Sequence, residues 1–228
     1  MIEHVYRRAA AARGVGQVIV ATDDERIADV VRAFGGAVQM TRSDHRTGTD
    51  RLAEVAATLS CDVIVNVQGD LPLLPPTAIE AAVAPLLNDD TLQVSTLCTP
   101  VHDEADYRNP NVVKVVRTQS GDALYFSRSP IPCWRSAAPA ETIRDGVPNR
   151  WGQALKHIGL YAYRRTFVGI FAALPPTPLE IAESLEQLRA LEHGYRIRVV
   201  LTDVASIEVD TPEDLERVRH LVAVGAQV

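Results

Sequence analysis

Apolar residues along the chain recur with two different periods, and the alternation between them predicts an α/β protein. Short β-branched runs bounded by Gly, Pro or Asp are typical of strands, and apolar residues three and four positions apart are typical of helices. The predicted helices cover residues 1–12, 25–34, 51–58, 76–87, 164–174 and 178–193, with a last one after 211. The predicted strands cover 17–24, 37–40, 63–67, 92–99, 112–117, 123–128, 158–163 and 196–201.

The run 63–67 predicts a buried parallel strand, because β-branched apolar residues continue until Gly69 and Asp70, and Pro72 halts them. Open α/β sheets bind ligands at the C-terminal edge of their strands, so Asp70 is expected at the ligand edge. An unpaired buried carboxylate is costly. We therefore expect Asp70 to be exposed to solvent at the rim, to pair with a cation, or to hold a metal or ligand, with an ordinary strand-end Asp that caps the next turn as the alternative.

The order of the first helices and strands is that of right-handed βαβ units in a parallel sheet. A crossover helix follows a parallel strand, yet the chain opens directly on a helix. We therefore expect that an N-terminal strand and its loop are missing from this sequence, which leaves a gap beside the strand that ends at Asp70. Gly14 and Gly16 follow a helix and precede a strand, the reverse of a dinucleotide-binding turn.

The second half of the chain leaves this pattern. The runs 112–117 and 123–128 predict a hairpin, and residues 130–150, rich in Pro, Ala and Arg, predict a long excursion. We expect Trp134 and Trp151 to pack this excursion onto the core, with a role as lid anchors or interface residues as the alternative. We predict one domain over residues 1–228, in which about 112–165 forms a small lobe with the hairpin and the excursion.

Composition excludes several classes of protein. With 228 residues and a net charge of −6, the chain can bury one sizeable core and lacks the basic footprint of a nucleic-acid-binding protein. No apolar run is long enough to span a membrane and no signal peptide is visible, so we expect a cytoplasmic protein without a membrane partner. Cys61, Cys98 and Cys133 have no metal-ligand spacing and are expected to be buried, reduced thiols.

Three polar groups are candidates for chemistry. The loop 41–51 can offer amides, hydroxyls and a guanidinium to a nucleotide, or can simply be a turn with Thr49 or Asp50 as helix N-cap and His45 at the surface. The helix 178–193 aligns Glu183, Glu186 and Gln187 on one flank, where a solvated acidic face is the alternative. Before the last helix, which Thr211 can cap with Pro212 at N1, Asp210 occupies a second rim position where it could meet Asp70 across a metal.

Seven segments occur in order along the chain: 47–51 (TGTDR), 65–70 (VNVQGD), 109–116 (NPNVVKVV), 125–128 (YFSR), 157–161 (HIGLY), 183–189 (ESLEQLR) and 209–215 (VDTPEDL). Together they make the chain similar to the 3-deoxy-manno-octulosonate cytidylyltransferase family, from Met1 to the last helix. This family activates the acid sugar Kdo with CTP and Mg²⁺ for bacterial lipopolysaccharide. The resemblance implies a Rossmann-like nucleotidyltransferase (nucleotide-diphospho-sugar transferase) fold, with a mostly parallel mixed sheet and a small β-rich dimerisation lobe, and a homodimer.

The resemblance also implies the site residues. Asp70 and Asp210 would hold Mg²⁺ and act in catalysis. Gly48, Thr49, Arg51 and Gln68 would line the nucleotide pocket. The sugar would contact Gln68, Arg128, His157, Tyr161, Glu186 and Gln187, with Arg128 opposite its carboxylate. The anomeric hydroxyl would attack the α-phosphorus of CTP and expel pyrophosphate, without a side-chain nucleophile.

Two departures from the family pattern leave alternatives open. Leu71 stands where the family has Glu, beside the metal ligand, and Met1 aligns just beyond the family's triphosphate-binding loop. The alternatives are a cytidylyltransferase for another acid sugar, such as a sialic acid, and a non-catalytic nucleotide- or sugar-binding partner of an intact copy.

Overall fold

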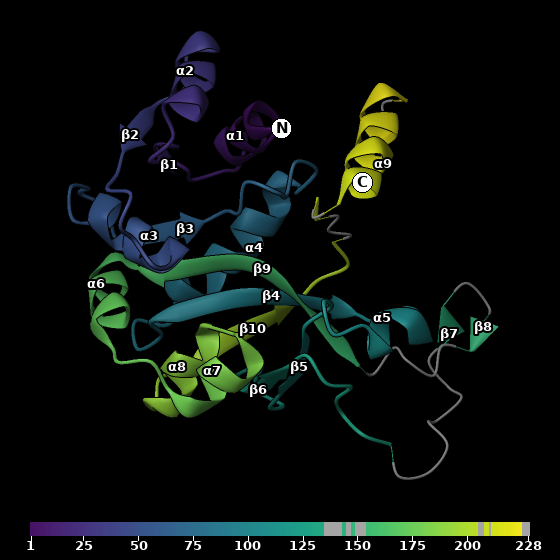
Figure 1. The fold of residues 1–228 in the computed structure, drawn as a ribbon. Coiled ribbons are helices and arrows are strands. Elements are labelled where there is room, and N and C mark those ends of the chain that lie inside the picture. The colour runs from purple at the N-terminus through teal and green to yellow at the C-terminus, as the bar shows by residue number, and fades with distance from the viewer. Residues whose placement is uncertain (135–142, 145–146, 149–153, 205–207, 210, 225–228) are drawn as a thin grey trace.

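The computed structural model describes residues 1–134, 143–144, 147–148, 154–204, 208–209 and 211–224 (Figure 1). Its helices are α1 Ile2–Ala10, α2 Glu25–Ala33, α3 Gly48–Ala56, α4 Pro76–Asn88, α5 Glu104–Arg108, α6 Arg165–Ala173, α7 Pro178–Glu183, α8 Gln187–Glu192 and α9 Pro212–Ala223. Its strands are β1 Val20–Thr22, β2 Val38–Met40, β3 Val63–Asn66, β4 Val94–Pro100, β5 Lys114–Arg117, β6 Ala123–Ser127, β7 Ile143–Arg144, β8 Val147–Pro148, β9 Leu155–Arg164 and β10 Ile197–Leu201.

The main sheet has six strands, and β9 is the strand around which it is assembled. The strand order is β10-β4-β9-β5-β6, and β3 also pairs with β9. β10 runs parallel to β4, whereas β9 is antiparallel to β3, β4 and β5. The predicted mixed α/β fold is therefore confirmed, but antiparallel pairs predominate in this sheet.

The prediction that β3 is a buried parallel strand is wrong in its orientation. Its described partner is β9, which returns across the sheet in the opposite direction. Most of its residues are only half-buried. β1 and β2 pair in parallel with each other in a separate two-stranded sheet. Among the described residues, no strand joins β1 to β3, where the sequence predicts a gap.

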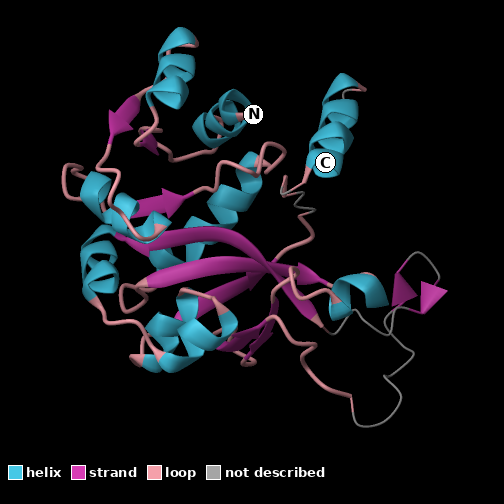
Figure 2. Ribbon diagram, viewed as in Figure 1, coloured by secondary structure: helices cyan, strands magenta, loops and turns pink. Residues whose placement is uncertain are grey.

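Helices cover both faces of the main sheet, as Figure 2 shows. One apolar cluster lies between the sheet and helices α1 and α4, and a second lies between the sheet and helices α3, α6 and α8. Because side chains alternate along a strand, Leu97 of β4 belongs to the first cluster and Cys98 to the second. The result is a three-layer arrangement.

Helix ends follow the sequence closely, with one correction. Asp24 caps α2, and Thr211 caps α9 with Pro212 at N1, as predicted for α9. The cap of α3 is Thr47, whose hydroxyl accepts from the Asp50 N–H at 3.2 Å, and not Thr49 or Asp50. Thr49 thereby falls inside the first turn and is buried.

The predicted hairpin is confirmed as β5 and β6, and β7 and β8 lie beyond α5, away from the main sheet (Figure 1). At the start of the excursion, Trp134 packs on Tyr107 with ring centroids 5.1 Å apart, as predicted. Trp151 and much of the excursion lie outside the described residues.

The cysteine prediction holds for one residue of the three. Cys98 is buried, and burial raises the pKa of its thiol to about 11. Cys61 and Cys133 are exposed, because they lie before β3 and in the excursion rather than on a sheet face. Within the described residues, no helix combines the length and hydropathy that crossing a membrane requires.

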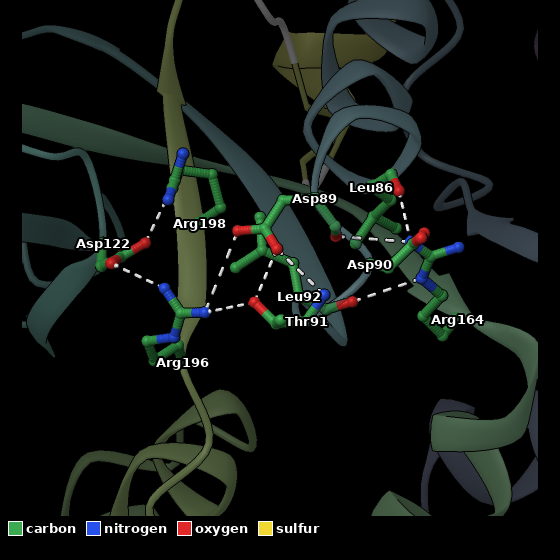
Figure 3. Close-up of polar contacts among 9 residues, drawn as sticks. All are labelled: Leu86, Asp89, Asp90, Thr91, Leu92, Asp122, Arg164, Arg196 and Arg198. Carbon is green, nitrogen blue, oxygen red and sulfur yellow. Dashed lines mark hydrogen bonds and ion pairs between the residues drawn. The ribbon is translucent and has the colours of Figure 1, made fainter.

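A polar network closes the edge of the sheet at which β4 and β10 begin (Figure 3). The Asp122 carboxylate accepts from Arg198 Nε at 2.7 Å and lies 3.5 Å from Arg196 Nη1. Arg196 also reaches the loop before β4, where its Nη2 donates to Thr91 Oγ1 at 2.8 Å. Arg164, at the end of β9, donates to Leu92 O and pairs with Asp90. The network joins the hairpin, β9 and β10 to the end of α4.

We expect Asp122→Asn to lower the free energy of unfolding by about 1–2 kcal/mol, because a charged acceptor shared by two arginines is lost from a site only 15% exposed. The measurement is urea denaturation. The control is Glu104→Gln, which removes an exposed helical pair with Arg108 and should cost less than about 0.5 kcal/mol. Equal losses in both variants would contradict this role of the network.

Candidate active site

The C-terminal end of β3 places two of the predicted residues. Asn66, its last residue, pairs with Tyr161 of β9, so the segment that carries Gln68 and Asp70 leaves the sheet beside Tyr161. Gln68 is exposed and Asp70 is half-buried. The Val209 N–H donates to Asp70 O at 3.0 Å, so the C-terminal segment passes this position. Asp210 lies outside the described residues.

Leu71, which stands where the family has Glu, is a core residue. Its side chain is 1% exposed and packs in the apolar cluster between the sheet and helices α1 and α4. The sequence pattern indicates only that a carboxylate is missing beside Asp70.

The start of α3 carries three of the residues that are predicted to line the nucleotide pocket. Gly48 is exposed, and the Thr49 hydroxyl donates to Glu186 Oε2 at 2.5 Å. Arg51 Nη1 donates to Thr41 Oγ1 at 2.7 Å and pairs with Asp23 at 2.8 Å. The hydrogen bond from Arg51 lowers the pKa of the Asp23 carboxyl. The loops after β1 and β2 are therefore fastened to α3.

His45 is not the surface residue that the sequence predicts. Its side chain is 4% exposed, and its Nε2 contacts the Glu54 carboxylate, whose pKa this contact lowers. Both line a depression of about 500 Å³ together with Arg42 and Arg46. None of the predicted site residues lies among the residues that line it.

The predicted helix 178–193 is broken into α7 and α8. Ser184 adopts the left-handed conformation, with φ 51° and ψ 49°, which a non-glycine residue rarely enters without support. The support is the residue before it. Glu183 Oε1 accepts from Ser127 Oγ at 2.6 Å, and its Oε2 accepts from the Arg128 N–H at 2.9 Å. Ile181, which a continuous helix would bury, is 69% exposed.

The same break holds the predicted sugar-binding arginine. Arg128 Nε donates to Glu183 O at 2.8 Å, Nη1 to Pro110 O at 3.0 Å and Nη2 to Ser184 O at 3.4 Å. Burial alone would raise the pKa of Glu183, but hydrogen bonds from Ser127, Arg128 and Tyr125 bring it below its usual value. Glu183 is thus ionised and hydrogen-bonded to the end of β6.

Lys114 holds the backbone of Arg128 through a hydrogen bond to its carbonyl. It is fully buried on β5, and its Nζ donates to Asn109 O at 2.8 Å, to Val112 O at 2.5 Å and to Arg128 O at 2.7 Å. Burial lowers the pKa of this ammonium. Three carbonyl acceptors nevertheless match its three N–H donors. Lys114 is not among the predicted site residues, although a lysine inside the apolar run 112–116 is a visible signal in the sequence.

The β9 side of the site is formed by His157 and Tyr161. Their rings lie 5.3 Å apart, and the Phe126 ring meets His157 edge-on at 5.1 Å. Thr96 Oγ1 lies 2.8 Å from His157 Nε2. Desolvation by the surrounding protein lowers the pKa of His157 to about 3, so the imidazole is neutral at pH 7.

The predicted residues fall into two contacting groups and a few that stand apart. Thr49 contacts Glu186, and Gln187 is buried at the start of α8. Glu186 Oε1 accepts no hydrogen bond from the described residues, although Arg189 Nη2 lies 3.8 Å away. Tyr161 contacts the His157 ring and pairs with Asn66, the last residue of β3, which precedes Gln68 and Asp70. No group of three His, Cys, Asp or Glu suited to a metal occurs in the described part of the chain.

Comparisons with known proteins identify the family of the chain. Residues 1–197 match the profile of the cytidylyltransferase family. The 3-deoxy-manno-octulosonate cytidylyltransferase of Geobacter metallireducens is 56% identical over 96% of this chain and 85% of its own length. That of Syntrophotalea carbinolica is 58% identical over 97% and 88%.

Solved structures are also similar. A CMP:2-keto-3-deoxy-manno-octonic acid synthetase complexed with CTP matches with a TM-score of 0.87 and 45% identity, over 98% of this chain and 88% of that one. A 4-diphosphocytidyl-2C-methyl-D-erythritol synthase from Anaerococcus prevotii shares the fold at 12% identity, with a TM-score of 0.60 over 97% of this chain and 85% of that one.

We expect Lys114→Met to lower the free energy of unfolding by about 3 kcal/mol, because three carbonyls lose the charged donor that a fully buried side chain supplies. Lys156, its cross-strand neighbour, contacts Asp106 at 3.4 Å and serves as the control. Lys156→Met should cost less than about 1 kcal/mol in the same urea titration. A small loss for Lys114→Met would show that water replaces the ammonium.

The lowered pKa of His157 predicts a pH dependence of stability. Between about pH 6.5 and 3 the unfolded chain binds a proton that the folded protein does not, so stability falls as the pH falls. His157→Gln should make the loss between pH 7 and 5 smaller by about 2 kcal/mol. His4→Gln, at an exposed position, should leave the loss unchanged. Equal losses in both variants would contradict a neutral His157.

Proposed function

The chain belongs to the cytidylyltransferase family, and we propose that it transfers CMP from CTP to the anomeric hydroxyl of 3-deoxy-D-manno-octulosonate (Kdo), with release of pyrophosphate. The observation that carries this proposal is the contact between Thr49, on the nucleotide edge, and Glu186, on the sugar side. It supports the proposal because it joins a predicted nucleotide-binding residue to a predicted sugar-binding residue. Identity above 50% to relatives of that name supports the choice of sugar.

In this proposal the start of α3 binds the nucleotide. Gly48 and Thr49 lie in the first turn, where free backbone N–H groups and the helix dipole favour an anion. Arg51, fixed by Thr41 and Asp23, adds a positive charge at this edge. Gln68 is exposed at the end of β3 and can reach both substrates.

Arg128 binds the sugar carboxylate. Its three backbone acceptors use three of the five N–H donors of a guanidinium, so its direction is set while donors remain for a ligand. His157, Tyr161, Glu186 and Gln187 contact the sugar hydroxyls. Since Glu186 Oε1 accepts no hydrogen bond from the described residues, it has capacity for a hydroxyl.

Asp70 and Asp210 hold Mg²⁺ in this proposal, and they act in catalysis through it. The donor set fits, because carboxylate oxygens suit a hard cation and the segment before Asp210 is bonded to the Asp70 backbone. When bound, the ion neutralises phosphate charge and lowers the pKa of the attacking hydroxyl. The protein's own contribution is alignment, since Arg128 and the α3 start fix the two substrates.

We further propose that two copies associate through the lobe 112–165, and that the enzyme acts in the cytoplasm in lipopolysaccharide synthesis. The support is the family and the position of the hairpin β5–β6 at the rim of the main sheet. The predicted absence of nucleic-acid and membrane partners stays a prediction.

The test is pyrophosphate release from CTP, with Kdo and Mg²⁺. We expect turnover with Kdo, and Asp70→Asn should reduce kcat by about a hundredfold or more. Asp62→Asn changes an exposed carboxylate before the same strand and is the matched control, with activity unchanged. Turnover with a sialic acid and not Kdo would move the assignment to another acid sugar. A folded protein that binds CTP yet releases no pyrophosphate with either sugar would contradict catalysis.

A further inference from the structure

Thr96 lies at a position where three polar atoms converge on one hydroxyl. It is fully buried on β4, opposite Tyr161 of β9. Its Oγ1 lies 2.8 Å from His157 Nε2, 2.8 Å from Leu160 O and 3.2 Å from Ile158 O. The pairing of β4 with β9 shifts register after Thr96, which brings these carbonyls of β9 to the same side chain.

A hydroxyl has one hydrogen, and this fixes the direction of each hydrogen bond. Leu160 O and Ile158 O can only accept, so the hydrogen of Thr96 Oγ1 is directed to a carbonyl. Oγ1 must then accept from His157 Nε2, which therefore carries the imidazole hydrogen. In a neutral ring the other nitrogen, Nδ1, has a lone pair and no hydrogen.

The ring itself is held by its neighbours. Phe126 meets it at an interplanar angle of 80°, Tyr161 lies across it at 50°, and the His157 N–H donates to Val113 O at 2.8 Å. Among the described residues, no hydrogen bond is made by Nδ1. An imidazole fixed in this way can accept a hydrogen bond at Nδ1 and cannot donate one there.

We propose that Thr96 is a positioning residue, which fixes His157 as the Nε2–H tautomer so that Nδ1 accepts a hydrogen bond from a hydroxyl of the acid sugar. This inference rests on the proposed function. This tautomer distinguishes a hydroxyl of the sugar from its carboxylate. A nitrogen that can only accept a hydrogen bond disfavours a carboxylate, which is bound by Arg128 instead. Thr96 thereby contributes to the orientation of the sugar without touching it.

The first measurement concerns the wild-type protein alone. In ¹⁵N-labelled histidine spectra, the His157 signals, assigned with His157→Gln, should show a protonated Nε2 and an unprotonated Nδ1 at pH 7. This result does not depend on the identity of the substrate. A protonated Nδ1 would overturn the tautomer assignment even if the enzyme uses Kdo.

The second measurement compares variants in the pyrophosphate assay. Thr96→Val keeps the shape and removes the acceptor, and it should raise the KM for Kdo about five- to tenfold with the KM for CTP unchanged. It should also leave His157 as a mixture of tautomers. Thr96→Ser keeps the hydroxyl and should restore both properties.

The matched control is Ser95→Ala. Ser95 is also fully buried on β4 and donates to Ala82 O, on the face that packs against α4, without contacting His157. It should leave the tautomer and the KM for Kdo unchanged. Equal effects of Thr96→Val and Ser95→Ala, or an unchanged tautomer in Thr96→Val, would overturn the proposal. If the spectra confirm the Nε2–H tautomer but the wild-type protein is inactive with Kdo, the proposed function and the sugar as ligand of Nδ1 are both contradicted. Only the tautomer assignment would then hold.

Discussion

The main-chain hydrogen bonds of β9 are the interaction on which the rest of the structure depends. This ten-residue strand pairs with β3, β4 and β5, so the sheet would separate into pieces without it. It carries His157 and Tyr161, and its last residue, Arg164, enters the polar network before β4. Two predicted sugar-binding residues and a member of the polar network therefore lie on one strand, and a change in the register of β9 would move both.

The second organising constraint is that buried charges must be satisfied. Lys114 is surrounded by three carbonyls, and Glu183 accepts three hydrogen bonds from the end of β6 and from Tyr125. Each group is costly to bury alone and stabilising once matched. Both residues contact Arg128. Lys114 donates to the Arg128 carbonyl, and Glu183 accepts from the Arg128 backbone N–H and from its guanidinium. The charged groups thus hold the Arg128 backbone, whereas the direction of its guanidinium is set by the carbonyls of Pro110, Glu183 and Ser184.

Local patterns in the sequence predicted most of the elements and several of their ends. The caps at Thr211 and Pro212 and the hairpin β5–β6 depend on neighbouring residues, and they were predictable. What sequence could not supply was long-range pairing. The antiparallel partner of β3 comes from a strand about a hundred residues later, and the break at Ser184 is supported by Ser127 and Arg128 of another element. The burial of the His45 side chain also depends on a contact outside its own loop, with Glu54 nine residues later on α3. The predicted site residues stay predictions in their roles, although the structure brings Thr49 and Glu186 together.

The separate sheet of β1 and β2 has a consequence for cooperativity. In the described part of the chain, no ladder of main-chain hydrogen bonds ties it to the main sheet. Side chains attach it to the rest of the domain. Tyr6 of α1 accepts from the Ala37 N–H and packs on Phe34, and Arg51 of α3 pairs with Asp23 and donates to Thr41. Such a unit can open with a lower free energy than the whole domain, as a foldon. Arg51 lies on α3, so amide exchange in β1 and β2 would report directly on how firmly the predicted nucleotide edge is held.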